Sequence, residues 1–337
     1  MPAILQTFPL GTPWPGADPF LFAMHHIDHY PAANPDMSPR ADLAGRQLGQ
    51  DFANRDGWNM YHGTSVPGFP AHPHRGFETV TVVEEGLVDH ADSEGAEARY
   101  GRGDTQWLTA GSGISHSEMF PLVNGDQPNT LHLFQIWLNL APGDKSAPAH
   151  FTMLWANETP VVEQVGESGR TARVKVVAGA FEGHTPPPPP PASWAARPEN
   201  HVAIWHAELE AGATLTLPPA DSSAVRTIYV YDGSLDVDGR ILNDSGAVID
   251  PSTALPVTAA TDSRARFLLL QGRPIGAPVV QHGPFVGNTR EDVIAAFTDY
   301  QNGVFGQWIH PTTDPVHDRE QGRFARYPDG TVRSPHE

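Results

Sequence analysis

Short strand-like runs, each followed by a turn signal, recur along the whole chain and favour an all-β fold. The run "ETVTVVEEGLVDHAD" (residues 78–92) alternates apolar and polar residues around a central Glu-Gly pair, which is typical of two strands joined by a turn. Similar runs occupy residues 131–140, 224–240 and 264–276. Turn signals spaced roughly eight to twelve residues apart indicate β-sandwiches or barrels.

The composition agrees with a turn-rich β protein of two domains. The 32 glycines and 34 prolines supply the residues that tight turns require, and 39% hydrophobic residues are enough for packed cores. At roughly 100–200 residues per domain, a chain of 337 residues is expected to form two domains. We place the linker in "APGDKSAPAH", which predicts one domain over residues 1–145 and a second over residues 146–337.

Two segments of the second half differ from the strand pattern. Six consecutive prolines at residues 186–191 predict a polyproline II stretch, and a stiff surface loop is favoured over a ligand for SH3-type domains. The run "NTREDVIAAFTDYQNG" predicts a short C-terminal helix at about residues 289–302. Asn288 or Thr289 can cap its start, and Gly303 can end it.

Composition and charge also exclude several classes of function. The absence of cysteine rules out disulfides, thiol catalysis and Cys-ligated metal sites, so any metal must be held by His, Asp or Glu. A formal charge of −18 argues against direct nucleic-acid binding. No apolar run approaches the ~18 residues of a membrane span, and the start "MPAILQTFPLGTPWPG" lacks a basic n-region. We therefore expect a cytoplasmic protein without membrane segments.

Two short stretches carry the candidate metal ligands. His72 and His74 are two residues apart in "HPHRG", and His116 and Glu118 have the same spacing in "HSE". Side chains two apart on a strand share a face, so neighbouring strands would bring three imidazoles and one carboxylate around one point. Such a set suits Fe(II), Mn(II), Ni(II), Cu(II) or Zn(II). Four protein ligands on a six-coordinate ion leave two positions for substrate and dioxygen.

Periodicity leaves two alternatives open. A lone His-x-His is most often not a metal site, but the added His-x-Glu after a glycine-rich turn, in a cysteine-free β protein, favours ligation. Glu78 competes with Glu118 because it shares the parity of the two histidines on the same run, and Gly76 can introduce a bulge. His132 is either a residue of the metal cavity or a hydrogen-bonded core histidine.

Four longer stretches resemble the pirin family of the cupin superfamily over roughly residues 17–304. They are "HPHRGFETVTVVEEGLVDHADSEG", "GDTQWLTAGSGISHSEMF", "LHLFQIWLNL" and "GRPIGAPVVQHGPFVGNTREDVIAAFTDYQNG". The resemblance implies a bicupin, in which two double-stranded β-helix (jelly-roll) barrels follow in tandem. The N-terminal barrel would hold one metal ion, usually iron, and the second would have no metal site. The resemblance maps the ligands onto His72, His74, His116 and Glu118, and so favours Glu118 over Glu78.

The resemblance also implies a reaction. Some pirin-like proteins cleave quercetin with dioxygen, as flavonol 2,4-dioxygenases that release carbon monoxide. A metal-dependent oxidoreductase of this kind would use Fe(II), with Mn, Ni, Cu, Co or Zn as alternatives, and Glu118 would accept the proton of the flavonol 3-hydroxyl. The main competing function is a non-catalytic regulator that responds to iron redox state and binds a protein partner. A sugar isomerase or epimerase is a further alternative.

Overall fold

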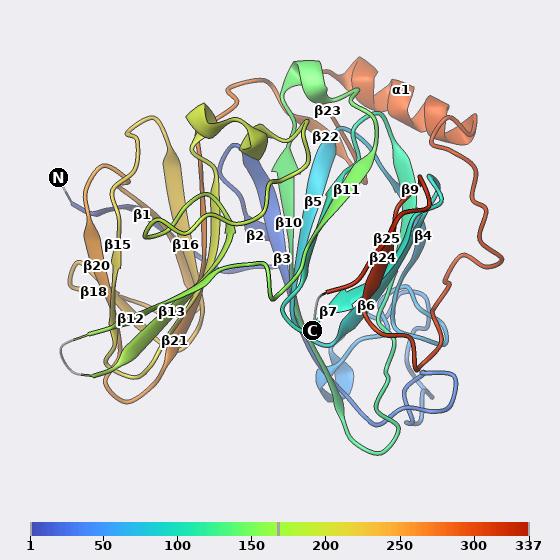
Figure 1. The fold of residues 1–337 in the computed structure, drawn as a ribbon, viewed down its shortest axis with the longest axis horizontal. Helices are drawn as coiled ribbons and strands as arrows, with labels where there is room; N and C mark the ends of the chain where they lie inside the picture. The colour runs from blue at the N-terminus through green and yellow to red at the C-terminus, as the bar shows by residue number, and fades with distance from the viewer. Residues whose placement is uncertain (1, 167–168, 336–337) are drawn as a thin grey trace. The chain divides into compact units, whose positions relative to one another are not determined.

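The computed structural model describes residues 2–166 and 169–335, and within these ranges it is almost entirely β, with twenty-five strands and one α-helix. The chain forms two compact units, each built from antiparallel strand pairs (Figure 1). The first barrel comprises His25–Gln135, Pro142–Ala156 and Ala277–Glu337. The second barrel comprises Met1–Met24, Ile136–Ala141 and Asn157–Gly276. The all-β prediction is confirmed.

The compact units do not follow the linear division expected at residue 145. The segment Ala277–Glu337, which contains the helix, groups with the first barrel rather than with the residues that precede it. The start of the chain, Met1–Met24, groups with the second barrel. The order of residues along the chain does not predict this grouping of the two terminal segments, because the grouping depends on which distant strands pair.

Two six-stranded sheets carry the first barrel. One has the order β11-β8-β5-β10-β3-β2, although β2 and parts of β3 and β10 belong to the second unit, and the other has the order β25-β24-β7-β6-β9-β4. The strands are β2 (Trp14–Pro15), β3 (Phe20–Tyr30), β4 (Gly68–His74), β5 (Phe77–Glu85), β6 (Leu87–Asp92), β7 (Glu97–Gly101), β8 (Thr105–Thr109), β9 (Ile114–Met119), β10 (Asn129–Asn139), β11 (His150–Leu154), β24 (Phe324–Arg326) and β25 (Val332–Arg333). Short 3-10 turns lie at Arg55–Gly57 and Pro142–Asp144.

The run that begins at His72 is two strands and not one. β4 ends at His74, and β5 begins at Phe77 in the other sheet. Gly76 lies between them at φ 86°, and a Cβ atom there would lie 2.0 Å from the carbonyl oxygen of Val286. Only glycine tolerates both this backbone conformation and this close approach, so the chain turns from one sheet to the other at this point.

The second barrel has a seven-stranded and a four-stranded sheet. Their orders are β1-β19-β16-β21-β14-β13-β12 and β15-β20-β17-β18. The strands are β1 (Ile4–Pro9), β12 (Val161–Val165), β13 (Thr171–Ala178), β14 (Ala203–Leu209), β15 (Thr214–Leu217), β16 (Val225–Asp232), β17 (Leu235–Val237), β18 (Arg240–Leu242), β19 (Ser245–Ile249), β20 (Leu255–Ala259) and β21 (Ala265–Gly272). Two 3-10 turns, Trp194–Ala196 and Pro198–Asn200, lie between β13 and β14.

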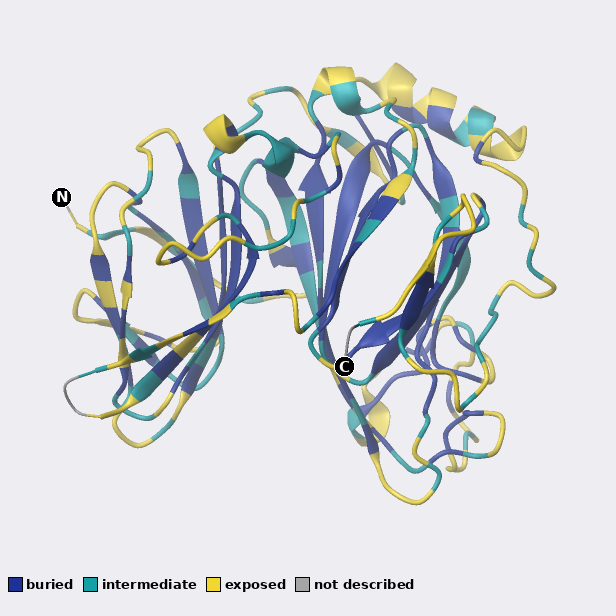
Figure 2. Ribbon diagram, in the orientation of Figure 1, coloured by how far each residue is buried: buried dark blue, intermediate teal, exposed yellow. Residues whose placement is uncertain are grey.

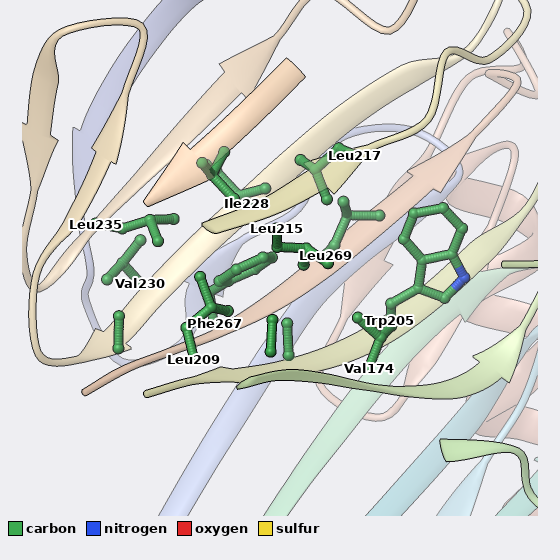
Figure 3. Packing of buried hydrophobic residues seen from close by; sticks show 14 of the residues in the cluster. Val174, Trp205, Leu209, Leu215, Leu217, Ile228, Val230, Leu235, Phe267 and Leu269 are labelled. Carbon is green, nitrogen blue, oxygen red and sulfur yellow. The ribbon is translucent and has the colours of Figure 1, made fainter. Parts of the chain in front are cut away.

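Side chains from both sheets of the second barrel meet in one apolar core (Figure 3). Phe267 and Leu269 lie two residues apart on β21. Both are fully buried in the same core as Leu209 of β14 and Leu215 of β15. Each such side chain contributes roughly 1.5–3 kcal/mol through removal of apolar surface from water. Trp205 of β14 belongs to the same core, at the opposite end from Leu235 in Figure 3.

The predicted C-terminal helix is present as α1 (Arg290–Gln301), after the hairpin of β22 (Val280–His282) and β23 (Phe285–Gly287). Thr289 caps it: its hydroxyl accepts from the Asp292 amide, and the Asp292 carboxylate accepts from the Thr289 amide, which is a capping box. Val293 and Ala296 are buried, and Figure 2 shows buried and exposed bands alternating along the helix. In the described residues, no helix has the length and apolar character required to cross a bilayer.

Candidate metal centre

Three histidines of the first barrel lie within reach of one ion. His72 and His74 are on β4, and His116 is on β9, its antiparallel neighbour, with His72 directly opposite His116. One ring nitrogen from each histidine lies within 4.8 Å of the other two. The ring centroids are 4.5 Å apart for His72 and His116, and 4.9 Å apart for His74 and His116. The structure thus brings together the three imidazoles that the spacing predicts.

A bulge in β4 sets the register of this pair of strands. Phe69 lies opposite Glu118 and His72 opposite His116, so β4 uses one more residue than β9 over this interval. In the bulge, the carbonyl oxygen of Pro70 lies 2.9 Å from His72 Nδ1. A proton on Nδ1 donated to this carbonyl leaves the lone pair on Nε2, which is the arrangement usual for a metal-bound histidine.

The three rings fit a metal ion on physical grounds. His116 is completely buried, and neither of its ring nitrogens has a hydrogen-bond partner among the described residues. Burial lowers the pKa of His72 to about 4 and holds the pKa values of His74 and His116 well below their usual range. The rings are therefore neutral at pH 7, the form in which imidazole binds metals. A cation would satisfy buried nitrogens that otherwise carry a desolvation cost.

Glu118 lies beside His116 but is not part of the group formed by the three histidines. Its Oε2 is 3.8 Å from His116 Nε2. The same oxygen accepts a hydrogen bond from Gln135 Nε2 at 2.8 Å, and Oε1 accepts a longer one, 3.4 Å, from the Thr81 hydroxyl. Burial raises the pKa of Glu118, so a nearby cation would favour its charged form. Its role as a fourth ligand stays a prediction.

The competing carboxylate, Glu78, has a different environment. It is fully buried on β5, and its Oε1 accepts a hydrogen bond from the Thr109 hydroxyl at 2.6 Å. The parity that linked Glu78 to the histidines does not apply, because β4 and β5 are separate strands in separate sheets. The structure therefore favours Glu118 over Glu78.

Sequence reasoning missed two polar residues around the centre. Gln135 of β10 donates a hydrogen bond to Glu118, whereas the sequence suggested His132 as the candidate residue of that strand. His132 instead lies 3.1 Å from His25 between their Nε2 atoms, as expected for a hydrogen-bonded core histidine. His90 of β6 is opposite Glu118 in register, and its ring centroid is 5.4 Å from that of His116. A single amide within an otherwise apolar run was the available signal for Gln135.

Both halves of the chain match models of known protein families. Residues 36–138 match the sequence model named Pirin, and residues 204–306 match the model of the pirin C-terminal cupin domain. The chain is 37% identical to a pirin-like protein of Caulobacter vibrioides, over 80% of this chain and 90% of the relative. Its identity to the pirin of Homo sapiens is 33%, over 74% of this chain and 81% of the relative.

Two further similar proteins are named for an activity. The chain is 35% identical to a Pseudomonas aeruginosa protein named a putative quercetin 2,3-dioxygenase, over 71% of this chain and 79% of the relative. A solved structure of quercetin 2,3-dioxygenase from Acinetobacter baumannii has a TM-score of 0.71 at 23% identity, covering 91% of this chain and 99% of that one. At this identity, the second similarity supports the fold alone.

Proposed function

The chain belongs to the pirin family of the cupin superfamily, and from this premise we propose that it is a metal-dependent dioxygenase that cleaves a flavonol-like substrate. One observation carries the proposal: three neutral imidazoles of the first barrel, two of them buried, have ring nitrogens within 4.8 Å of one another. We infer iron(II) as the ion, with Mn, Ni, Cu, Co or Zn as alternatives that the same ligand types accept. The name of the Pseudomonas aeruginosa relative supports the substrate class.

The centre offers what this reaction needs. A bound divalent ion would supply Lewis acidity toward an enol oxygen and positions for further ligands. Glu118 would accept the proton of the substrate hydroxyl. Gln135 holds this carboxylate in a fixed orientation through the 2.8 Å hydrogen bond. The carboxylate that accepts the proton would thus be held in a fixed position relative to the substrate hydroxyl.

Aromatic side chains lie beside two of the candidate ligands. The ring of Phe77 lies 5.1 Å from that of His74, and the ring of Phe69 lies 6.2 Å from that of His72. His74 and His116 are buried, whereas His72 is partly exposed. A substrate would therefore approach on the side of His72, and an apolar planar molecule suits these aromatic neighbours.

A spectroscopic assay tests the activity. Protein loaded with iron(II) without oxygen and mixed with quercetin should lose the flavonol's visible absorbance only after oxygen is admitted, with release of carbon monoxide. The same assay is repeated with Mn, Ni, Cu and Co. Full metal occupancy without turnover in every case would contradict the dioxygenase proposal and favour the non-catalytic regulator, which a pull-down dependent on iron oxidation state would detect.

Metal analysis tests the ligands separately. We expect His74→Ala and Glu118→Ala to abolish stoichiometric iron, as measured by elemental analysis of folded protein. His29→Ala is the matched control, because His29 is exposed on β3 and outside the histidine group. Full iron occupancy in either ligand variant would show that the residue is not a ligand. The cytoplasmic location stays a prediction.

A further inference from the structure

The second barrel contains a cavity of about 680 Å³, and none of the candidate metal ligands lines it. All of its lining residues lie between Ala178 and Gln271, so it belongs wholly to this unit. The prolines at residues 186–189 form part of its wall, and Trp205, Arg226 and Gln271 form another part. Cavities of roughly 300–1,000 Å³ are the usual size of small-molecule sites.

Arg226 is the unusual residue in this wall. It is 1% exposed, yet no carboxylate forms an ion pair with it within the described residues. Its Nε donates to Gln271 Oε1 at 2.7 Å, and its Nη1 donates to the carbonyl oxygen of Pro218 at 2.8 Å. No hydrogen bond of the described chain uses Nη2. Burial lowers the pKa of Arg226 to about 10, which still leaves it charged at neutral pH.

The surrounding residues hold this guanidinium in place. Gln271 lies directly opposite Arg226 in the pairing of β16 with β21, and its own amide donates to the His201 carbonyl oxygen at 2.9 Å. The indole ring of Trp205 lies beside the charge, with its centroid 5.9 Å from the guanidinium carbon. An oriented, buried cation without a counter-ion is costly in the free protein and ready to accept an anion.

Asp221 is the acidic residue of the cavity wall, and other contacts already engage it. Its carboxylate accepts a hydrogen bond from the Ser223 amide at 2.8 Å and lies 3.9 Å from His201 Nε2. Its side chain is 48% exposed, so solvent screens its charge. The charge of Arg226 therefore remains available inside the cavity.

The polyproline stretch supplies a rigid apolar part of the same cavity wall. Residues 186–190 form no helix or strand, as the sequence predicts for a loop. Proline rings have no backbone N–H to offer, so this part of the wall recognises a ligand by shape and apolar contact. The ring of Trp205 adds a flat apolar face.

We propose that the second barrel binds a small organic carboxylate with a planar apolar body in this cavity. The carboxylate pairs with Nη2 of Arg226, and the body of the ligand packs between Trp205 and the prolines at 186–189. The site is independent of the proposed dioxygenase activity, since none of its residues is a candidate metal ligand.

Three aromatic probes of similar shape and different charge test this site on the intact wild-type protein. We expect benzoate to bind at millimolar or tighter affinity by calorimetry, and neutral benzamide to bind roughly tenfold or more weakly, because it lacks the charge-assisted hydrogen bond. Cationic benzylamine should not bind. Absence of benzoate binding, or equal binding of benzamide, would overturn the proposal without any variant.

Variants then locate the bound probe. Arg226→Met should weaken benzoate binding at least about tenfold. Arg226→Lys keeps the charge without the planar fork and should show a smaller loss, which covers the case in which the methionine variant does not fold. Arg173→Met is the matched control on the exposed face of β13 and should bind benzoate as the wild type does. His74→Ala should also bind it normally, whereas unchanged affinity in both Arg226 variants would refute the site.

Discussion

The side-chain amide of Gln135 donates to Glu118 Oε2 at 2.8 Å, and the two residues lie in different sheets of the first barrel. Gln135 is on β10, and Glu118 is on β9 with the candidate ligand His116. One hydrogen bond therefore spans the barrel interior and fixes the carboxylate that faces the histidines. Such outer contacts set the orientation and basicity of metal ligands.

Loss of this hydrogen bond should weaken the metal centre. We expect Gln135→Ala to reduce iron affinity by about 10–100-fold, as measured by competition with a chelator, because the Glu118 carboxylate loses its fixed orientation. Gln127→Ala is the control, since Gln127 is exposed near the start of β10. Unchanged affinity in Gln135→Ala would mean that Glu118 is not held for metal binding.

His26 should make stability depend on pH. It is buried, and its Nδ1 lies 2.8 Å from the Tyr61 hydroxyl, which donates to Asp28 Oδ2 at 2.6 Å. Burial lowers the pKa of His26 to about 4 from a usual 6.5, so between these values the unfolded chain binds more protons. The free energy of unfolding should fall as the pH is lowered through this window, by up to about 3 kcal/mol from this residue.

A paired variant isolates the effect of His26. His26→Asn keeps a donor for Tyr61 but does not titrate, and Asp28, whose pKa burial raises, is present in both proteins. The wild type should therefore lose more stability than His26→Asn between pH 7 and pH 4.5, as measured by urea unfolding of metal-free protein. Parallel pH profiles would contradict this assignment.

The pair of Asp89 and Arg99 should be essential for stability. Arg99 Nε and Nη2 donate to the two Asp89 oxygens at 2.6 and 2.7 Å, and both side chains are fully buried. Arg99 also donates to the carbonyl oxygen of His317 at 3.0 Å, so the pair secures the C-terminal segment. Asp89→Asn should lower the free energy of unfolding by about 3–5 kcal/mol, because it leaves a buried charge without its counter-ion.

Urea unfolding and limited proteolysis measure this effect. We expect Asp89→Asn to expose the segment around residue 317 to protease. The matched control is Glu163→Gln, which removes the partner of Arg173 in a surface pair of the same length, 2.7 Å, and should change stability little. Equal stability of the two variants would show that the buried pair contributes no more than the surface pair.

The capping box should stabilise the start of α1. Thr289→Ala removes the hydroxyl that accepts from the Asp292 amide at 3.1 Å, and should lower the local opening free energy of the helix by about 1 kcal/mol. Hydrogen exchange of the first-turn amides measures this change. Thr298→Ala, an exposed position in the middle of the helix, is the control and should leave the first turn unaffected. Equal exchange in both variants would contradict the role of the cap.

Local sequence patterns were sufficient to predict the strands and the C-terminal helix. Alternating runs predicted the strands, and capping residues predicted a helix at about 289–302, where the structure has Arg290–Gln301. These features depend on residues two to four apart, which is the range over which strand and helix geometry acts. The same range predicted that His72 and His74 share a face.

Contacts between residues far apart in the chain could not be predicted from such local patterns. The strand break at Gly76 depends on the Val286 carbonyl oxygen, about two hundred residues later, so the parity of Glu78 was misleading. The grouping of Ala277–Glu337 with the first barrel likewise depends on pairings such as that of β24 with β7. No periodicity in the sequence encodes either contact.

The sequence by itself thus determined the all-β class, the cap of the helix and the histidines available for one ion, because each follows from short-range backbone geometry. Only the tertiary structure showed that Glu118 lies beside His116, that Gln135 donates to it, and that Arg226 is buried without a counter-ion among the described residues. Pairing and burial are set by long-range packing, in which residues far apart in the chain exclude water together.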